Sequence, residues 1–169
     1  YADLKDSILI GEQSRFNIAS NGKQFTALAL LLLIEEKKVS LEDDLRKFLP
    51  ELYPNIKKPI KIKYLLNHSS GIRDVYDLWS LQGYTWWKEI FSNEDVMTLV
   101  RKQNDLDFEP GSKHSYSNTN YILLAKIIEK VSGKTFVDFT NELFQSLDMP
   151  NTSFVADYKN IKGSIAKPY

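Results

Sequence analysis

Two residues three positions apart, Ser20 and Lys23, have the types and spacing that suit nucleophilic catalysis. They stand at the beginning of a predicted helix, where positions i and i+3 share one face. Burial and the positive helix end both disfavour an ammonium ion, and a neutral lysine amine can take the proton of a serine hydroxyl. Backbone N–H groups at a helix start also suit a developing oxyanion. The pair predicts Ser20 as nucleophile and Lys23 as base, although a serine is equally a favoured N-cap.

A second candidate pair, Tyr116 and Asn118, follows the Pro110-Gly111 turn and precedes another predicted helix. A tyrosine on such a loop can transfer a proton. The amide of an asparagine can bind a substrate amide through both its donor and its acceptor. From these residues alone, the simpler interpretation is that Asn118 caps the helix and Tyr116 packs against it.

The helix that must position the first pair is predicted over residues 20–37 and is apolar on all sides, which is typical of a buried central helix. Its first turn breaks local rules. Gly22 costs about 1 kcal/mol relative to alanine in a helix, and Lys23 places a positive charge at the positive end of the helix dipole. Broken local rules tend to mark functional sites.

The remaining pattern predicts five or six helices in total and little strand. An aromatic segment at 76–91 is interpreted as core, with a substrate-cleft wall as the alternative. Gly133 is predicted to end the helix that begins near Asn118 or Thr119. The other predicted helices follow a capping box at 40–43, lie near the end of 60–67, start at Ser92 and run to about 103, and span 135–144.

Composition excludes several classes of function. Lys+Arg and Asp+Glu are balanced at 22 each, so nucleic acid and anionic membrane surfaces are not favoured partners. The absence of cysteine excludes disulfides and a thiol nucleophile. His68 and His114 are too few for a metal site, so neither metal nor cofactor is expected, and His68 is interpreted as a turn residue. Residues 132–135 lack the first glycine of a phosphate loop, and no Gly-x-Ser-x-Gly elbow occurs.

Five segments in order resemble the serine β-lactamase-related family, which includes class C β-lactamases, D-alanyl-D-alanine carboxypeptidases and related esterases. The resemblance implies a penicillin-binding-protein-like serine hydrolase that forms an acyl-enzyme on Ser20. Lys23 and Tyr116 would handle protons, and Asn118 would orient a β-lactam, a D-amino-acid peptide or an ester. It also implies a periplasmic or extracellular location. The five segments are residues 16–27, 39–44, 64–72, 110–121 and 147–152.

The family's third motif, Lys-Thr-Gly or His-x-Gly on a later strand, has no counterpart after Asn118, and Lys162-Gly163-Ser164 has the wrong order. We therefore expect an α+β, β-lactamase/transpeptidase-like fold of which this chain is mainly the helical domain, with most of the antiparallel sheet missing. Residues 1–19 would be a strand or loop remnant that leads to the nucleophile, and 20–169 the mostly helical part. The chain alone would be poorly active. A non-catalytic sensor or binding module is the alternative.

Overall fold

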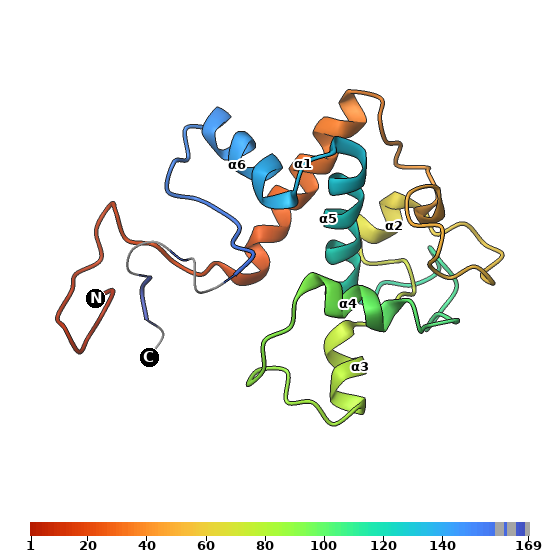
Figure 1. Cartoon of the computed structure of the whole chain (residues 1–169), viewed down its shortest axis with the longest axis horizontal. Coiled ribbons are helices and arrows are strands. Elements are labelled where there is room, and N and C mark those ends of the chain that lie inside the picture. The colour runs from red at the N-terminus through yellow and green to blue at the C-terminus, as the bar shows by residue number, and fades with distance from the viewer. Residues whose placement is uncertain (158–160, 162–164, 168–169) are drawn as a thin grey trace.

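The computed structural model describes residues 1–157, 161 and 165–167, and its regular structure is helical. Figure 1 shows α1 and α5 side by side at the centre, with α6 packed on both. The short helix α2 packs on α5, and α3 and α4 contact each other and α5. The six helices of the described residues are α1 (Lys23–Glu35), α2 (Ile62–Leu66), α3 (Val75–Leu81), α4 (Asn93–Val100), α5 (Asn118–Ser132) and α6 (Phe136–Ser146).

No strand longer than one residue forms in the described part of the chain. Extended pairing is limited there to isolated bridges, Asp3 with Ile8, Arg15 with Ile165 and Asp44 with Lys61. This agrees with the expected helical domain without its sheet, and the structure goes further, because the described residues hold none of that sheet. Lys162 to Ser164, the triplet considered for the third motif, lie outside the described residues.

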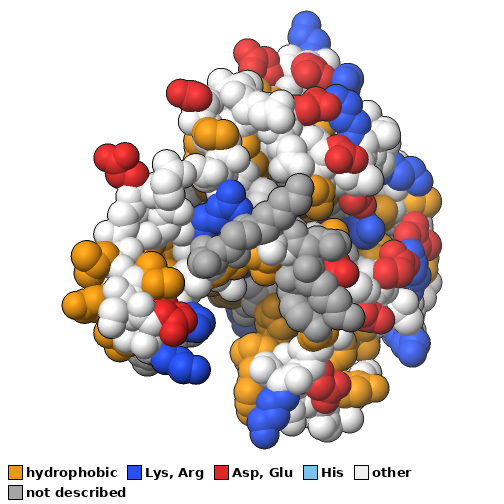
Figure 2. Space-filling model, turned by 60° about the vertical axis from the view of Figure 1, so that its left-hand side comes forward, with side chains coloured by type: hydrophobic (Ala, Val, Ile, Leu, Met, Phe, Trp, Pro, Cys, Tyr) orange, Lys and Arg blue, Asp and Glu red, His pale blue; other side chains and the backbone are white. Residues whose placement is uncertain are grey.

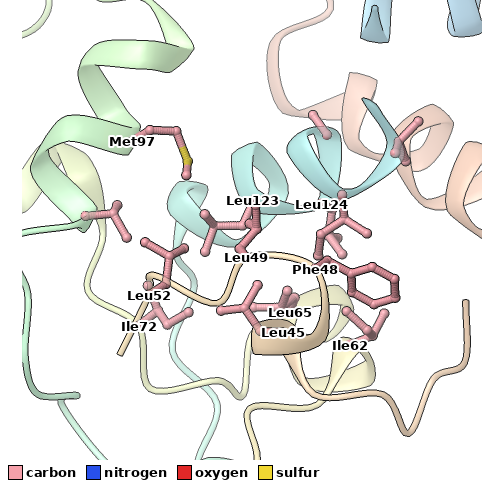
Figure 3. Close-up of a cluster of buried hydrophobic side chains, with 14 of the residues drawn as sticks. Leu45, Phe48, Leu49, Leu52, Ile62, Leu65, Ile72, Met97, Leu123 and Leu124 are labelled. Atoms are coloured by element: carbon pink, nitrogen blue, oxygen red, sulfur yellow. The ribbon is translucent and has the colours of Figure 1, made fainter. Parts of the chain in front are cut away.

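Buried residues of all six helices and of the loop that follows α1 form the hydrophobic core. Figure 3 shows the part of it where that loop, α2, α4 and α5 meet. Leu123 and Leu124 of α5 are fully buried, and they meet Leu65 of α2 in this cluster. Within α1, Leu30 is buried whereas 47% of Leu31 is exposed. The expectation that α1 is buried on every side is therefore wrong, because the face that carries Leu31 is exposed to solvent in the described part of the chain.

The predicted helix after Ser40 is also wrong. Only a 3-10 turn, η2 (Leu45–Lys47), forms there. The segment instead pairs with residues 60–63, because the Leu45 N–H donates to the Ile60 carbonyl (2.8 Å) and the Asp43 carbonyl accepts from Ile62 (2.9 Å). These contacts occupy backbone groups that a helix would have used internally. Leu45, Phe48 and Leu49 are still buried in the core, as their apolar spacing predicts.

Other predicted helix ends are confirmed at Ser92, Gly133 and Thr135, and the start of α5 is shifted by one residue. Ser92 and Asp95 form a reciprocal capping box at the start of α4. Gly133 ends α5 in the left-handed conformation, at φ +71°. Thr135 caps α6 by accepting a hydrogen bond from the Asp138 N–H. The N-cap of α5 is Ser117, one residue before the predicted position, so Asn118 is helical and its side chain is available for other contacts.

The aromatic segment divides between core and surface. Its first part forms α3, which the sequence pattern did not predict. Trp79 is buried and stacks on Phe91 with ring centroids 3.7 Å apart, as the core interpretation requires. Trp86 contacts Tyr76 at 4.6 Å, but 66% of Trp87 lies exposed. The core interpretation is therefore right for the inner rings and wrong for the outer ones.

Residues 1–18 lie outside the helical core, and their large apolar side chains are poorly covered. Leu9, Ile10 and Phe16 are each more than half exposed. Figure 2 shows hydrophobic side chains exposed in several separate places on the face that it presents. None of the helices in the described part of the chain has both the length and the apolar composition needed to cross a membrane.

Candidate active site

Ser20 lies on a 3-10 turn, η1 (Ala19–Gly22), directly before α1, and not in the first turn of an α-helix as predicted. The turn begins with Ala19 at φ +45°, whose N–H donates to the Asn17 side chain at 2.9 Å. A 3-10 turn has three residues per turn, so positions i and i+3 eclipse each other. The predicted relation between Ser20 and Lys23 is thus kept by a tighter turn, and Ser20 is exposed at its surface.

The half-buried side chain of Lys23, the first residue of α1, connects the parts of the site. Its Nζ donates to Ser20 Oγ and to Asn118 Oδ1, both at 2.9 Å. It also lies 5.0 Å from the ring centre of Tyr116 and 5.7 Å from that of Tyr121. A cation at the start of a helix is unfavourable. The side-chain oxygen of Asn118 and the faces of the two tyrosine rings offset this cost for Lys23.

Tyr116 reaches the same serine from the other side of the site. Its hydroxyl donates to Ser20 Oγ at 2.9 Å. Partial burial raises the pKa of Tyr116, but hydrogen bonds with Lys23 and Ser20 and the charge of Lys23 outweigh burial and lower the pKa below its ordinary value. The phenolate is therefore easier to form here than in free tyrosine. About half of the side chain (47%) remains exposed, so a ligand can approach it.

Asn118 does not serve as a helix cap. Its Oδ1 accepts from Lys23, its Nδ2 donates to Asp74 Oδ2 at 2.9 Å, and its backbone N–H donates to the same carboxylate oxygen. The interpretation of Asn118 as a cap is therefore wrong. The structure brings together all four residues predicted from the sequence: Ser20, Lys23, Tyr116 and Asn118.

His68 and Asp74 join this group, although their residue types alone did not single them out. The His68 ring lies 4.4 Å from the Tyr116 ring and 5.3 Å from that of Tyr121. Its Nδ1 accepts from the Ser117 N–H at 3.2 Å. Burial, with the nearby charges of Lys23 and His114, lowers the pKa of His68. His68 is a turn residue, as predicted (φ +57°), and it also supports the tyrosine.

The segments 68–74 and 107–120 are joined by hydrogen bonds, and we call this pair of segments the brace. The Ser115 N–H donates to the His68 carbonyl (2.9 Å), and the Gly111 N–H to that of Ser69 (2.7 Å). The buried Ser70 hydroxyl donates to Asn120 Oδ1 at 2.7 Å. The brace holds the loop that presents Tyr116. The sequence indicates that residues 64–72 belong to the site only through their resemblance to a family segment. That resemblance gives no role to His68 or to any other single residue.

The described residues contain no group of three or more His, Asp or Glu side chains that could hold a metal ion. The groups that contact Ser20 Oγ are the Lys23 amine and the Tyr116 phenol, and the Asn118 amide accepts from that amine. Such a set suits proton transfer and hydrogen bonding to a substrate.

Comparison with known proteins places these features in a family. The family model described as Beta-lactamase matches residues 1–163. The chain is 37% identical over 140 residues to penicillin-binding protein 4* of Bacillus subtilis (strain 168), which covers 82% of this chain and 30% of that protein. It is 32% identical over 158 residues to a D-aminopeptidase of Brucella anthropi, covering 93% of this chain and 29% of that protein. The chain thus spans about a third of the length of these relatives.

The structure of a penicillin-binding protein from Bacillus halodurans superposes with a TM-score of 0.82 at 29% identity, over 98% of this chain and 50% of that one. The helices described above are therefore the helical part of the β-lactamase/transpeptidase-like fold, about half of the solved relative. The family model, the sequence identity and the fold agree, and the chain belongs to the beta-lactamase family.

Proposed function

We propose that this chain carries the nucleophile and proton-transfer groups of a serine hydrolase that forms an acyl-enzyme on Ser20. The observation that carries the proposal is the shared contact at Ser20 Oγ, which lies 2.9 Å from both the Lys23 amine and the Tyr116 hydroxyl. A serine hydroxyl is a weak nucleophile unless a neighbouring base removes its proton. Two groups able to do so meet at this one oxygen.

In the proposed acylation step, Ser20 Oγ forms a bond to the substrate carbonyl carbon while its proton passes to the neutral Lys23 amine or to the Tyr116 phenolate. The tetrahedral intermediate then collapses, the bond from carbon to the leaving nitrogen or oxygen breaks, and the same proton passes to the leaving group. Water hydrolyses the acyl ester and returns the site to its starting state. Both candidate bases lie at equal distance from Ser20 Oγ, so geometry alone does not choose between them.

The names of two relatives and the exposure of Ser20 and Tyr116 support a proposal for the substrate class. One relative is named a penicillin-binding protein and another a D-aminopeptidase. We infer a substrate with a β-lactam, D-amino-acid amide or ester carbonyl. Asn118 would orient Lys23 and meet the substrate amide. One alternative is a sensor that binds such ligands at Ser20 without turnover, which the same contacts at Ser20 would also allow.

Mass spectrometry after treatment with a fluorescent penicillin or an activated ester tests the proposal, on the longest form of the protein that can be expressed. We expect an adduct on the peptide that contains Ser20, and its loss in Ser20→Ala. Ser146→Ala, at the exposed end of α6, is the matched control and should keep the adduct. Absence of the adduct with both reagents would overturn the proposal. A stable adduct without hydrolysis would favour the sensor.

A further inference from the structure

We propose that Asp74 is a positioning residue, which fixes the Asn118 amide so that the amide oxygen faces Lys23. Asp74 Oδ2 accepts from both the backbone N–H and the Nδ2 of Asn118. Its other oxygen, Oδ1, accepts from the Tyr76 N–H at 2.8 Å and caps α3. The role of Asp74 in catalysis rests on the proposed function, whereas its hold on the amide does not.

The partners of the amide allow only one orientation. A carboxylate offers only acceptors, and a lysine ammonium offers only donors. With Nδ2 toward Asp74 and Oδ1 toward Lys23, both contacts are hydrogen bonds. In the flipped amide, oxygen would face the carboxylate and NH₂ would face the protonated amine, and both hydrogen bonds would be lost. Asp74 therefore decides which end of Asn118 meets Lys23.

This orientation bears on the nucleophile because Lys23 is held between two acceptors. Its Nζ lies 2.9 Å from Asn118 Oδ1 and 2.9 Å from Ser20 Oγ. When the amine is neutral, an N–H that donates to Asn118 leaves the lone pair free to accept the Ser20 proton. A flipped amide would instead donate to that lone pair and compete with the serine.

The fold anchors Asp74 firmly enough for this role. Asp74 caps α3, and Val75 and Trp79 of that helix are buried in the core. On the same side, Thr119 Oγ1 donates to the Arg73 carbonyl at 2.8 Å, which ties the start of α5 to the residue before Asp74. Core packing of α3 therefore fixes the position of the Asp74 carboxylate. The carboxylate in turn fixes the orientation of the Asn118 amide through its hydrogen bonds.

Asp74→Asn tests the role with little change in volume, and asparagine is as good an N-cap as aspartate. One oxygen of the new side chain can serve either Tyr76 or Asn118, and its NH₂ must face a donor in either case. We expect the rate of Ser20 acylation to fall by about 10- to 100-fold, the scale of a misplaced reacting group. Asp77→Asn, an exposed acid on the same helix, should change the rate less than about twofold.

A double-mutant cycle separates positioning from general support of the fold. If Asp74 acts through Asn118, Asp74→Asn should slow acylation less than about threefold in an Asn118→Ala background. An equal loss in both backgrounds would overturn the proposal. Asp74→Ser, which retains a capping oxygen but has no second oxygen for Asn118, should reproduce the loss and gives a second route if Asp74→Asn folds poorly.

A measurement that does not depend on acylation tests the role of Asp74 separately from the proposed function. If the wild type gives no Ser20 adduct, the proposed function fails, and NMR of the Asn118 side-chain amide then decides the role of Asp74. We expect its two N–H signals to be shifted and slow to exchange in the wild type and in Asp77→Asn, and to move toward free-amide values in Asp74→Asn. Unchanged Asn118 signals in Asp74→Asn would overturn the inference.

Discussion

The two sides of the candidate site are held in different ways. Ser20 lies on an exposed 3-10 turn that is stabilised mainly by local contacts, such as the bond from the Asn21 N–H to the Ile18 carbonyl. Tyr116 and Asn118 lie on the brace, where residues about 40 to 50 positions apart are joined and Ser70 and Asn120 are buried. The nucleophile is thus presented by a local turn, and the groups that act on it are fixed by long-range contacts. Mutations on the two sides should differ accordingly.

The largest effect is expected from Gly71→Ala, within the brace. Gly71 has φ +80°, and an added Cβ would lie 2.1 Å from the Phe108 carbonyl oxygen. The left-handed conformation alone costs a non-glycine residue roughly 1–2 kcal/mol, and a clash with backbone forces the two segments apart. We expect the free energy of unfolding to fall by more than about 3 kcal/mol, measured by urea denaturation.

Gly83→Ala is the matched control, because Gly83 has φ +85° and no atom within 4 Å of its added Cβ. It should lose only the backbone contribution, roughly 1–2 kcal/mol. Equal losses in the two variants would show that the close approach of residues 71 and 108 does not matter, and that the brace is less tightly closed than its contacts indicate.

A smaller effect is expected from titration of His68. Burial and the charges of Lys23 and His114 lower its pKa, so the unfolded state binds its proton at higher pH than the folded state does. The stabilising contribution of neutral His68 is then complete above the unfolded pKa of about 6.5 and is lost as pH falls through the lower folded value. Urea denaturation between pH 7 and 5 should show this loss in the wild type.

His68→Asn isolates this contribution, because asparagine tolerates the positive φ at this position but does not titrate. The stability of the variant should fall less over the same pH range, since its carboxylates are unchanged. Parallel curves for the two proteins would mean that His68 titrates alike in the folded and unfolded states, and that burial and the charges of Lys23 and His114 do not lower its pKa.

The difference between local contacts around Ser20 and long-range contacts in the brace also explains which features could be predicted from the sequence. Ser20, Lys23 and the caps at Ser92 and Gly133 depend on spacings of a few residues, and these are visible in the sequence. The helix predicted after Ser40 does not form because its backbone groups pair with residues 60–63, farther along the chain than a local pattern reveals.

Asp74 was missed for the same reason. Its partner is 44 positions later in the chain, and an aspartate before a short helix is equally well explained as a cap. His68 was interpreted as a turn residue, which is right for its backbone, but its stacking on Tyr116 depends on the approach of two distant loops. Family resemblance identified the segments, and only the folded chain assigns contacts to their residues.

The smallest effect is expected from Gly22→Ala, on the side of the nucleophile. The sequence pattern predicts that Gly22 lowers the stability of the helix and is present because the active site needs it. The structure allows this prediction to be tested. Gly22 has ordinary helical angles (φ −61°), and an added Cβ would meet the Phe154 ring at 3.4 Å, a distance that the side chain can accommodate. Alanine at a compatible position stabilises a protein by roughly 0.4–1 kcal/mol, chiefly by restricting the unfolded chain.

We therefore expect Gly22→Ala to raise the urea midpoint slightly, whereas Gly133→Ala, at φ +71° with open space around it, should lower the midpoint. A rise in stability together with slower acylation of Ser20 would mean that the glycine serves the approach of substrate to the turn and not the fold. A loss of stability instead would mean that the added methyl group clashes with the Phe154 ring. The turn that carries Ser20 would then be packed as tightly as the brace.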